Sequence, residues 1–387
     1  MGYNSNNMIY PDYKNSIVNL TSSILKAFNV NSPYSSLREL DDLKNYKNIV
    51  LLLIDGLGYE YLQKYGQGSE LNKHCLKKIT SVFPSTTASA TTSLETGVAP
   101  QQHGITGWFM FLKEIGVLAK VLPFKPRYGG QSFSSDNICR KDIFTEKRIV
   151  DKIKSAAFVI YPGHIIDGKV NKKSKSLVGY KNLNDMFLQI KKTIKSSNGR
   201  KYIHAYWDTF DTLCHEKGCA SKEASNHFWQ LDKKISSFSK SLKGTSTALI
   251  ITADHGLIDT TEKSKIILLH KHPKLVETLV MPLSGEPRVA YCYIHPQKTK
   301  QFENYIKENL DYCWEVYKSV DLLNKEVFGL FEANKKLIDR IGDYVLVMKE
   351  NYIMKDFLLT EKEECHIGNH GGTSSNEMFV PLIKFDF

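Results

Sequence analysis

Three short runs of apolar residues are typical of strands buried in a parallel sheet. They cover residues 48–54, 202–207 and 248–252. Their hydrophobicity is nearly continuous rather than alternating, which favours a strand covered on both faces. Each run is followed directly by an acidic residue or by an Ala-Asp-His sequence. The polar residues that follow the runs are therefore expected at the ends of the strands.

Apolar residues at helical spacing predict two helices. Residues 16–28 carry apolar side chains three or four positions apart, which indicates an amphipathic helix. A second stripe lies between the last two strands and predicts a helix packed on the sheet; it comprises Phe228, Leu231, Ile235, Phe238 and Leu242. Strands that alternate with helices predict an α/β fold with an open, mostly parallel sheet, in which ligands bind at the carboxyl ends of the strands.

Two further regions fit this alternation less well. Residues 109–199 are rich in Gly, Pro, Ser and Lys, and residues 266–363 alternate strand-like pieces (289–294 and 344–348) with a helix-like stretch near 301–310. Both are candidate caps over the site. No linker separates them from the rest, so the chain (1–387) is expected to be one domain with these regions inserted.

Composition narrows the function classes. Of 387 residues, 42% are hydrophobic and 24% are charged, which excludes a disordered chain. The surplus of 52 Lys and Arg over 41 Asp and Glu points to an anionic partner such as a phosphate ester, a nucleic acid or a membrane surface. The alternative is a simple preference for lysine. No nucleic-acid-binding motif is present, so no stable nucleic-acid partner is predicted.

The cysteines and the apolar segments bear on the compartment. Seven cysteines are scattered without a Cys-x-x-Cys pair, which argues against a disulfide framework or a thiolate zinc site and fits a reducing compartment. The N-terminal residues lack the pattern of a signal peptide, and the longest apolar run is far short of the ~20 residues that span a bilayer. A soluble, cytoplasmic protein without a transmembrane segment is expected.

The strand ends carry residues suited to a metal. The candidate ligands are Asp55, Asp211, His215, Asp254, His255 and His370. A carboxylate and an imidazole four residues apart, as at 211 and 215, share one face of a helical turn. Oxygen and nitrogen ligands without thiolate suit zinc, with manganese or iron as alternatives. An Asp at a strand end is also a common helix cap, so the indication comes from the whole set.

A hydroxyl-rich segment follows the first strand. Eight Ser and Thr residues fall between positions 85 and 96. Such a segment often caps a helix. It also suits a hydroxyl nucleophile at a helix N-terminus, where backbone N–H groups attract a phosphoryl group.

Taken in chain order, these blocks resemble the alkaline phosphatase superfamily and, within it, the type I phosphodiesterase/nucleotide pyrophosphatase family. The matching blocks are 54–56, 83–97 with Pro100 and 103–105, 206–218, 252–256, 370–372, 377–378 and 380–382. The resemblance implies a three-layer fold with a mostly parallel sheet. It also implies a hydrolase of small phosphate esters, nucleotides among them, that uses two divalent metal ions.

The resemblance assigns roles by position. It makes Thr87 the nucleophile that forms a phosphothreonine intermediate, with the backbone at Ala88 stabilising the phosphoryl oxygens. One metal would be held by Asp55, Thr87, Asp254 and His255, and the other by Asp211, His215 and His370. Tyr206 would stack on a nucleoside or leaving group, and His103 would have a structural role in its turn.

The sequence departs from the family where substrate is bound. Trp108 stands where nucleotide pyrophosphatases have an Asn, and Phe210 stands where they have a Pro. Lys125, Arg127 and Lys141 could clamp an anion or form a solvated face. A phosphomonoesterase, a phosphonate hydrolase and a non-catalytic basic binding protein remain alternatives, and the sequence does not fix the oligomeric state.

Overall fold

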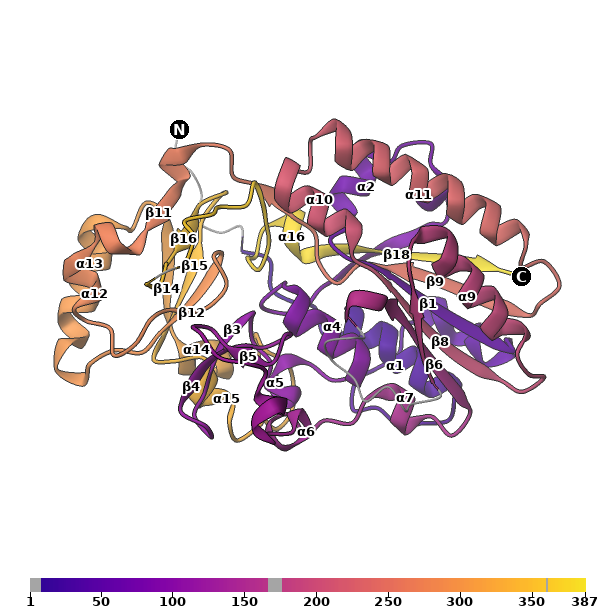
Figure 1. Cartoon of the computed structure of the whole chain (residues 1–387), viewed down its shortest axis with the longest axis horizontal. Helices are drawn as coiled ribbons and strands as arrows, with labels where there is room; N and C mark the ends of the chain where they lie inside the picture. The colour runs from indigo at the N-terminus through magenta and orange to yellow at the C-terminus, as the bar shows by residue number, and fades with distance from the viewer. Residues whose placement is uncertain (1–7, 166–175, 360) are drawn as a thin grey trace.

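The computed structural model describes residues 8–165, 176–359 and 361–387, and it contains two seven-stranded sheets at opposite ends of the molecule (Figure 1). In the first sheet the strands lie in the order β2 (Cys75–Thr80), β18 (Phe379–Asp386), β9 (Thr247–Thr252), β1 (Asn48–Ile54), β8 (Lys201–Trp207), β6 (Ala156–Pro162) and β7 (Leu177–Tyr180). The run from β9 to β7 is parallel, and β18 is antiparallel to both of its neighbours. The predicted mostly parallel sheet is confirmed.

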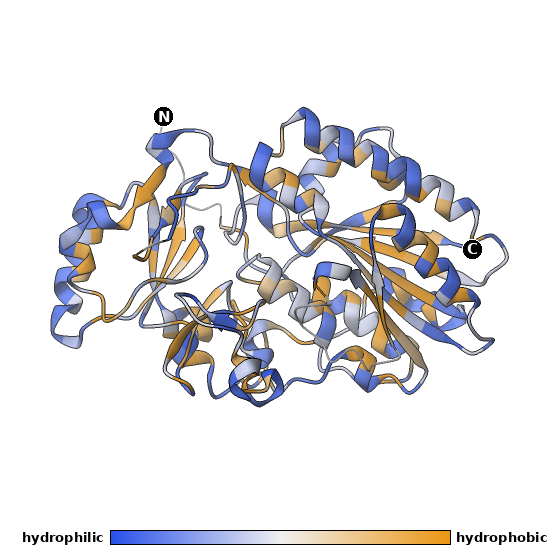
Figure 2. Cartoon of the chain, viewed as in Figure 1, coloured by the Kyte–Doolittle hydropathy of each residue, from blue (hydrophilic) through white to orange (hydrophobic). Residues whose placement is uncertain are grey.

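Helices cover both faces of the first sheet (Figure 1). One face carries α2 (Tyr59–Tyr65), α9 (Leu183–Lys195) and α11 (Lys222–Lys240), and the other carries α1 (Ile17–Ala27), α4 (Thr87–Thr96) and α7 (Ile149–Lys152). Figure 2 shows the strands as mostly hydrophobic and the helices as polar on their outer faces. Both predicted helices are confirmed, as α1 and α11. The predicted stripe is buried, although α11 ends at Lys240, two residues before the last apolar position.

The second sheet is entirely antiparallel. Its strands lie in the order β14 (Trp314–Lys318), β15 (Tyr344–Met348), β13 (Val289–Cys292), β12 (Ser284–Gly285), β3 (Phe109–Leu112), β4 (Val117–Lys120) and β5 (Lys125–Pro126). The apolar residues of α13 (Thr299–Asn309) belong to a cluster with β13, β14 and β15. The strand-like and helix-like pieces predicted between 266 and 363 therefore form β13, β15 and α13.

The two expected cap regions have different places in this architecture. Residues 266–363 supply four strands of the second sheet, and residues 109–199 supply the other three. The later part of residues 109–199, however, contributes β6 and β7 to the first sheet and α9 to the helices that cover it. The description of both regions as caps inserted into a single domain remains a prediction.

Short elements complete the chain. They are α3 (Glu70–Lys73), α5 (Pro100–His103), α6 (Arg140–Ile143), α10 (Thr209–Lys217), α12 (Pro273–Val276), α14 (Ser319–Asn324), α15 (Leu337–Arg340), α16 (Ser375–Met378) and the strand pairs β10 (Ile258–Asp259) with β17 (Gly368–Asn369) and β11 (Ile266–Leu268) with β16 (Ile353–Lys355). In the part of the chain that the structure describes, no helix combines the length and apolarity that crossing a membrane requires.

A buried ion pair joins the second sheet to α16. The guanidinium of Arg288, which precedes β13, donates from Nε to Glu377 Oε1 at 3.0 Å and from Nη2 to Glu377 Oε2 at 2.8 Å. The same carboxylate accepts from the backbone N–H of Gly372 and from the hydroxyl of Ser374. Both charged side chains are at most 1% exposed. The pair therefore holds the loop around residues 371–374 against both sheets.

Removing this carboxylate is expected to destabilise the protein strongly. Glu377→Ala leaves the Arg288 charge buried without a partner, which typically costs about 3–5 kcal/mol. We expect a clear fall in the midpoint of thermal unfolding, measured by circular dichroism. Asp41→Ala is the matched control, because it breaks an exposed 2.8 Å pair with Lys26 and exposed pairs contribute little. Equal midpoints for the two variants would contradict this assignment.

Candidate active site

The predicted metal ligands converge at one edge of the first sheet. Asp55 follows β1, Asp254 and His255 follow β9, and Asp211 lies in α10, directly after β8. Because these three strands are parallel neighbours, their carboxyl ends meet. His370 reaches the same place from the residue after β17.

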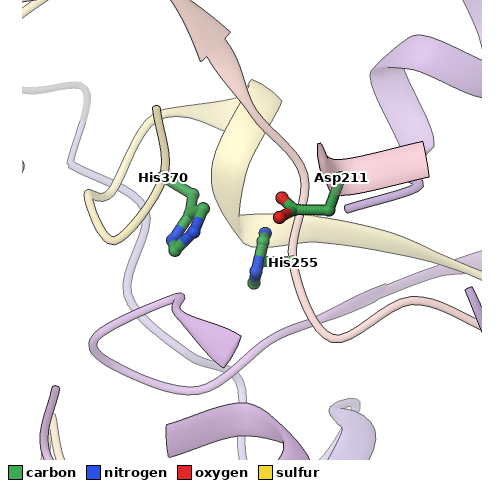
Figure 3. Close-up of side chains that lie close together, drawn as sticks. All are labelled: Asp211, His255 and His370. Atoms are coloured by element: carbon green, nitrogen blue, oxygen red, sulfur yellow. The ribbon is translucent and has the colours of Figure 1, made fainter. Parts of the chain in front are cut away.

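Two groups of side chains are close enough to share a cation. One ligand atom each from Asp55, Asp254 and His255 lies within 4.8 Å of the others, and the same holds for Asp211, His255 and His370. Figure 3 shows the Asp211 carboxylate and the two imidazole rings of the second group beside one another. His255 therefore lies between the two groups. His215 also belongs to this cluster, with its Nε2 3.1 Å from Asp211 Oδ2.

The hydrogen bonds of two histidines fix which ring nitrogen faces the cluster. Nδ1 of His255 lies 3.1 Å from the carbonyl oxygen of Gly256, and Nδ1 of His215 lies 2.7 Å from that of Gly368. A carbonyl only accepts, so each Nδ1 carries a proton and the Nε2 of each ring faces the cluster, where it either shares a proton with a carboxylate or offers its lone pair to a cation. The Nε2 of His255 is 3.4 Å from Asp55 Oδ1. A lone pair facing a carboxylate is repulsive unless a proton or a metal ion lies between them.

Burial makes the charges of this cluster costly. Burial and the neighbouring carboxylates of Asp254 and Asp211 raise the pKa of Asp55 well above its usual range, and burial also raises the pKa of Asp254. Burial acts in the same direction on Asp211, but the adjacent His215 outweighs it and holds the pKa of Asp211 below its ordinary value. Burial and His255 lower the pKa of His370.

Several polar atoms of the cluster are left without partners. Asp55 Oδ1, Asp211 Oδ1, Asp254 Oδ2 and His370 Nδ1 are buried and form no hydrogen bond with any residue that the structure describes. Buried polar groups are normally satisfied, so such a concentration requires an explanation. Carboxylate oxygens and imidazole nitrogens are ligands of divalent cations. The residues present therefore fit a metal centre.

Thr87 lies at the edge of this cluster, as the first residue of α4. Its Oγ1 is 3.0 Å from His255 Nε2. The preceding Thr86 gives its hydroxyl hydrogen bond to Glu286. Free backbone N–H groups and the helix dipole make this end of a ten-residue helix attractive to anions. Ala88, the next residue, is fully buried.

Four other hydroxyls of the Ser/Thr-rich segment form hydrogen bonds within α4. Thr91, Thr92, Ser93 and Thr96 each donate to the carbonyl four residues earlier, the usual bond of these residues inside a helix. Their donors are used within the helix, whereas the Thr87 hydroxyl faces His255.

His103 holds the turn after α4. Its Nδ1 accepts from the backbone N–H of Ile105, and its Nε2 lies 3.0 Å from the Ser93 hydroxyl. Burial lowers the pKa of His103 to about 3, so the ring is neutral. It contacts α4 and its own turn rather than the cluster of candidate ligands.

Tyr206 and Trp108 lie near the candidate ligands in different ways. The Tyr206 hydroxyl donates to the Asp55 carboxylate, and its ring, which is 8% exposed, packs against Tyr161. The backbone N–H of Trp108 donates to Glu286 Oε1 at 2.7 Å. Both side chains line the cavity beside the cluster, so a role of either in substrate binding remains a prediction.

A large cavity opens from the cluster between the two sheets. Its volume is about 1320 Å³. Aromatic and apolar side chains form part of its wall: Trp108, Phe109, Leu122, Pro123, Phe124 and Phe144. Of the three cations considered as a clamp, Lys125 and Lys141 line the cavity. Arg127 is buried and bonded to Glu361, so it neither lines the cavity nor belongs to a solvated face.

Two charged residues that the sequence did not single out also line this cavity. Glu286 follows β12, and Lys355 ends β16. Glu286 accepts from the Thr86 hydroxyl at 2.6 Å, and burial raises the pKa of its carboxyl to about 7. Neither lies in a recognisable motif. Only the pairing of segments about 200 residues apart brings Glu286 to the start of α4.

Comparison with known proteins agrees with this architecture. A model of the type I phosphodiesterase / nucleotide pyrophosphatase family matches residues 49–373. Murine ectonucleotide pyrophosphatase / phosphodiesterase 5 superposes with a TM-score of 0.64 at 19% identity over 86% of this chain and 87% of that chain. The human protein superposes at 0.63, with 19% identity over 87% of each chain. At this identity the likeness shows the fold.

A further solved structure belongs to the same group. It is an inactive variant of the murine protein in complex with AMP, with a TM-score of 0.63, 18% identity and coverage of 86% of this chain and 87% of that chain. None of the curated proteins matches this sequence.

Because the carboxylates of the cluster are crowded and buried, we expect a bound metal ion to raise the stability of the protein. Zinc at one hundred times its dissociation constant should stabilise the protein by about 2.7 kcal/mol, seen as a rise in the thermal midpoint that a chelator reverses. Asp254→Asn should raise the midpoint without metal, because it removes a buried charge beside Asp55, and should abolish most of the zinc effect.

Asp208→Asn is the control for this experiment. Asp208 lines the same cavity but pairs with His164, outside the two groups. Its variant should keep the zinc effect. Loss of the effect in this variant, or its survival in Asp254→Asn, would count against a metal at the predicted place.

Proposed function

The chain belongs to the type I phosphodiesterase / nucleotide pyrophosphatase family, and we propose that it cleaves small phosphodiesters, nucleotides among them, with Thr87 as nucleophile. Its family makes it a hydrolase of the phosphodiesterase type. The observation that carries the proposal is the position of the Thr87 hydroxyl, at the N-terminus of α4 and 3.0 Å from His255 Nε2.

The proposed ligands of two divalent cations are those that the family resemblance assigns; they overlap with the two groups of side chains, in which His255 is shared. Asp55, Thr87, Asp254 and His255 would hold one, and Asp211, His215 and His370 would hold the other. The unpartnered oxygens of all three carboxylates support cations beside them. Zinc is the proposed metal because the ligands are oxygen and nitrogen atoms, and manganese and iron are the alternatives. When bound, such ions polarise the phosphate ester and offset negative charge on the attacking and leaving oxygens.

The proposed reaction has two steps, both at phosphorus. The Thr87 hydroxyl gives its proton to solvent, and its oxygen forms a bond to phosphorus while the bond to the leaving oxygen breaks; the leaving oxygen departs with the electron pair and takes up a proton from solvent. Water then attacks phosphorus, the bond between phosphorus and Thr87 Oγ1 breaks, and a proton of the attacking water restores the Thr87 hydroxyl. The N–H groups of the first turn of α4, that of Ala88 among them, are placed to stabilise the phosphoryl oxygens.

Supporting side chains hold these groups in position. The Glu286 carboxylate fixes Thr86 and the backbone of Trp108, which tethers the start of α4 to the second sheet. The Tyr206 hydroxyl fixes one oxygen of Asp55, which leaves the other free for a cation. The aromatic wall of the cavity offers a surface for a nucleoside or an aromatic leaving group.

The solved relatives support a nucleotide as substrate. The inactive murine variant carries a threonine-to-alanine substitution and was solved with AMP. That a threonine is essential there supports the assignment of Thr87 here.

The proposed location remains the cytoplasm, on the grounds of the scattered cysteines of the sequence.

Thr87→Ala is expected to abolish turnover. Loss of a nucleophile typically lowers kcat by a factor of about 10³ or more. The measurement is release of p-nitrophenol from the p-nitrophenyl ester of thymidine 5′-monophosphate by the zinc-loaded protein. Thr92→Ala is the matched control, because Thr92 lines the same cavity and bonds only within α4. Retained activity in Thr87→Ala at full metal content would refute the assignment.

The same assay separates the alternatives within the superfamily. Wild-type protein should hydrolyse the diester faster than p-nitrophenyl phosphate or a phosphonate. A preference for either of the latter would replace the diesterase by a monoesterase or a phosphonate hydrolase.

A further inference from the structure

The outer sides of α9 and α11 form one continuous surface. Both helices cover the same face of the first sheet (Figure 1). The rings of Phe187 in α9 and Phe238 in α11 pack with their centroids 4.7 Å apart, so the two helices lie side by side. Their apolar stripes are buried, and the opposite sides face solvent. No residue of either helix is among those that line the catalytic cavity of the described chain.

Lysines recur at helical spacing on this surface. In α11, Lys222, Lys233 and Lys240 are exposed and lie 11 and 7 positions apart, so they share one strip of the helix. This strip is about 27 Å long. In α9, Lys192 and Lys195 are exposed on the side opposite to the buried stripe. We call these five lysines the basic face.

Neighbouring carboxylates do not neutralise the basic face. None of its lysines forms an ion pair with a residue in the described ranges, whereas Lys26, on the other side of the sheet, is paired with Asp41. In the two helices, Asp185 is bonded to a neighbouring glutamine, and Asp232 is buried and bonded to the backbone of α3. Glu223 is their exposed carboxylate. Part of the surplus positive charge of the sequence is therefore concentrated here.

Two exposed apolar side chains lie among these lysines. Trp229 in α11 is 42% exposed and lies four positions before Lys233. Leu188 in α9 is 47% exposed and lies four positions before Lys192. Apolar and aromatic side chains interspersed with lysines are typical of helices that lie in a membrane interface. A nucleic acid offers phosphates to the lysines but no apolar layer that would bury Leu188.

We infer that the basic face docks the protein on a bilayer that contains anionic lipids. The lysines bind the lipid phosphates electrostatically, and Trp229 and Leu188 enter the headgroup layer. Each lysine close to such a surface strengthens binding by about fivefold. The inference does not depend on the reaction proposed for Thr87, because the basic face lies outside the catalytic cavity.

Sedimentation with lipid vesicles tests this inference. The full chain should bind vesicles of phosphatidylcholine mixed with an equal amount of phosphatidylglycerol, but not vesicles of phosphatidylcholine alone, and salt should weaken the binding. Lys195→Gln combined with Lys233→Gln should weaken it about 25-fold. The matched control is Lys300→Gln combined with Lys307→Gln, which removes two exposed lysines of α13 and should weaken binding less than about twofold.

Tryptophan fluorescence gives a second measurement. Brominated lipids quench a tryptophan that enters the bilayer, so the fluorescence of bound wild-type protein should fall. Trp229→Phe should lose this quenching, because Trp207 and Trp314 are buried and Trp108 lines the catalytic cavity. Bound wild-type protein without quenching would overturn this docking face.

The remaining outcomes are equally decisive. No binding to the mixed vesicles, or an equal loss in the Lys300 and Lys307 variant, would overturn the inference. Lysine-dependent binding of a DNA duplex without binding of vesicles would overturn it in favour of a nucleic acid. Loss of vesicle binding in Thr87→Ala would overturn it in favour of lipid bound in the catalytic cavity.

The inference and the proposed function can fail separately. The Lys195 and Lys233 variant should hydrolyse a soluble diester at the wild-type rate while it loses the vesicles. Lysine-dependent vesicle binding by a protein that hydrolyses no diester would uphold the docking face and refute the proposed reaction instead.

Discussion

Repulsion among three buried carboxylates is the constraint on which the rest of the site depends. Asp55, Asp211 and Asp254 are each at most 8% exposed and lie at the ends of neighbouring parallel strands. Two histidines turn their Nε2 atoms towards this cluster, because their Nδ1 atoms are bonded to carbonyls. Such an arrangement is costly without positive charge. Divalent cations are the proposed source of that charge, and the same cations would prepare Thr87 for attack.

The second sheet contributes to this site as well as to stability. Glu286 reaches the start of α4 from the turn between β12 and β13. The ion pair of Arg288 with Glu377 fixes the loop that follows His370. Most of the residues proposed for chemistry thus follow strands of the first sheet, whereas the second sheet supplies residues proposed to hold them in position. The cavity lies where the two meet.

The strands that precede the candidate ligands could be predicted from the sequence, whereas much of the second sheet and some residues of the site could not. A parallel strand buried on both faces is a continuous apolar run, so β1, β8 and β9 and the polar residues after them could be predicted. The half-exposed β2 and the antiparallel β18 gave no such signal. The second sheet pairs β12 with β3, which lie far apart in the sequence, and no local pattern records that pairing. Glu286, which follows β12, was missed for this reason.

The central claim is that two metal ions occupy the ends of the parallel strands, and anomalous diffraction tests it most directly. Crystals of the zinc-loaded protein, measured on both sides of the zinc absorption edge, should show two peaks in this cavity. One should lie against Asp55, Asp254 and His255, and the other against Asp211 and His370. No peak at these residues, or zinc bound only elsewhere in the molecule, would contradict the account.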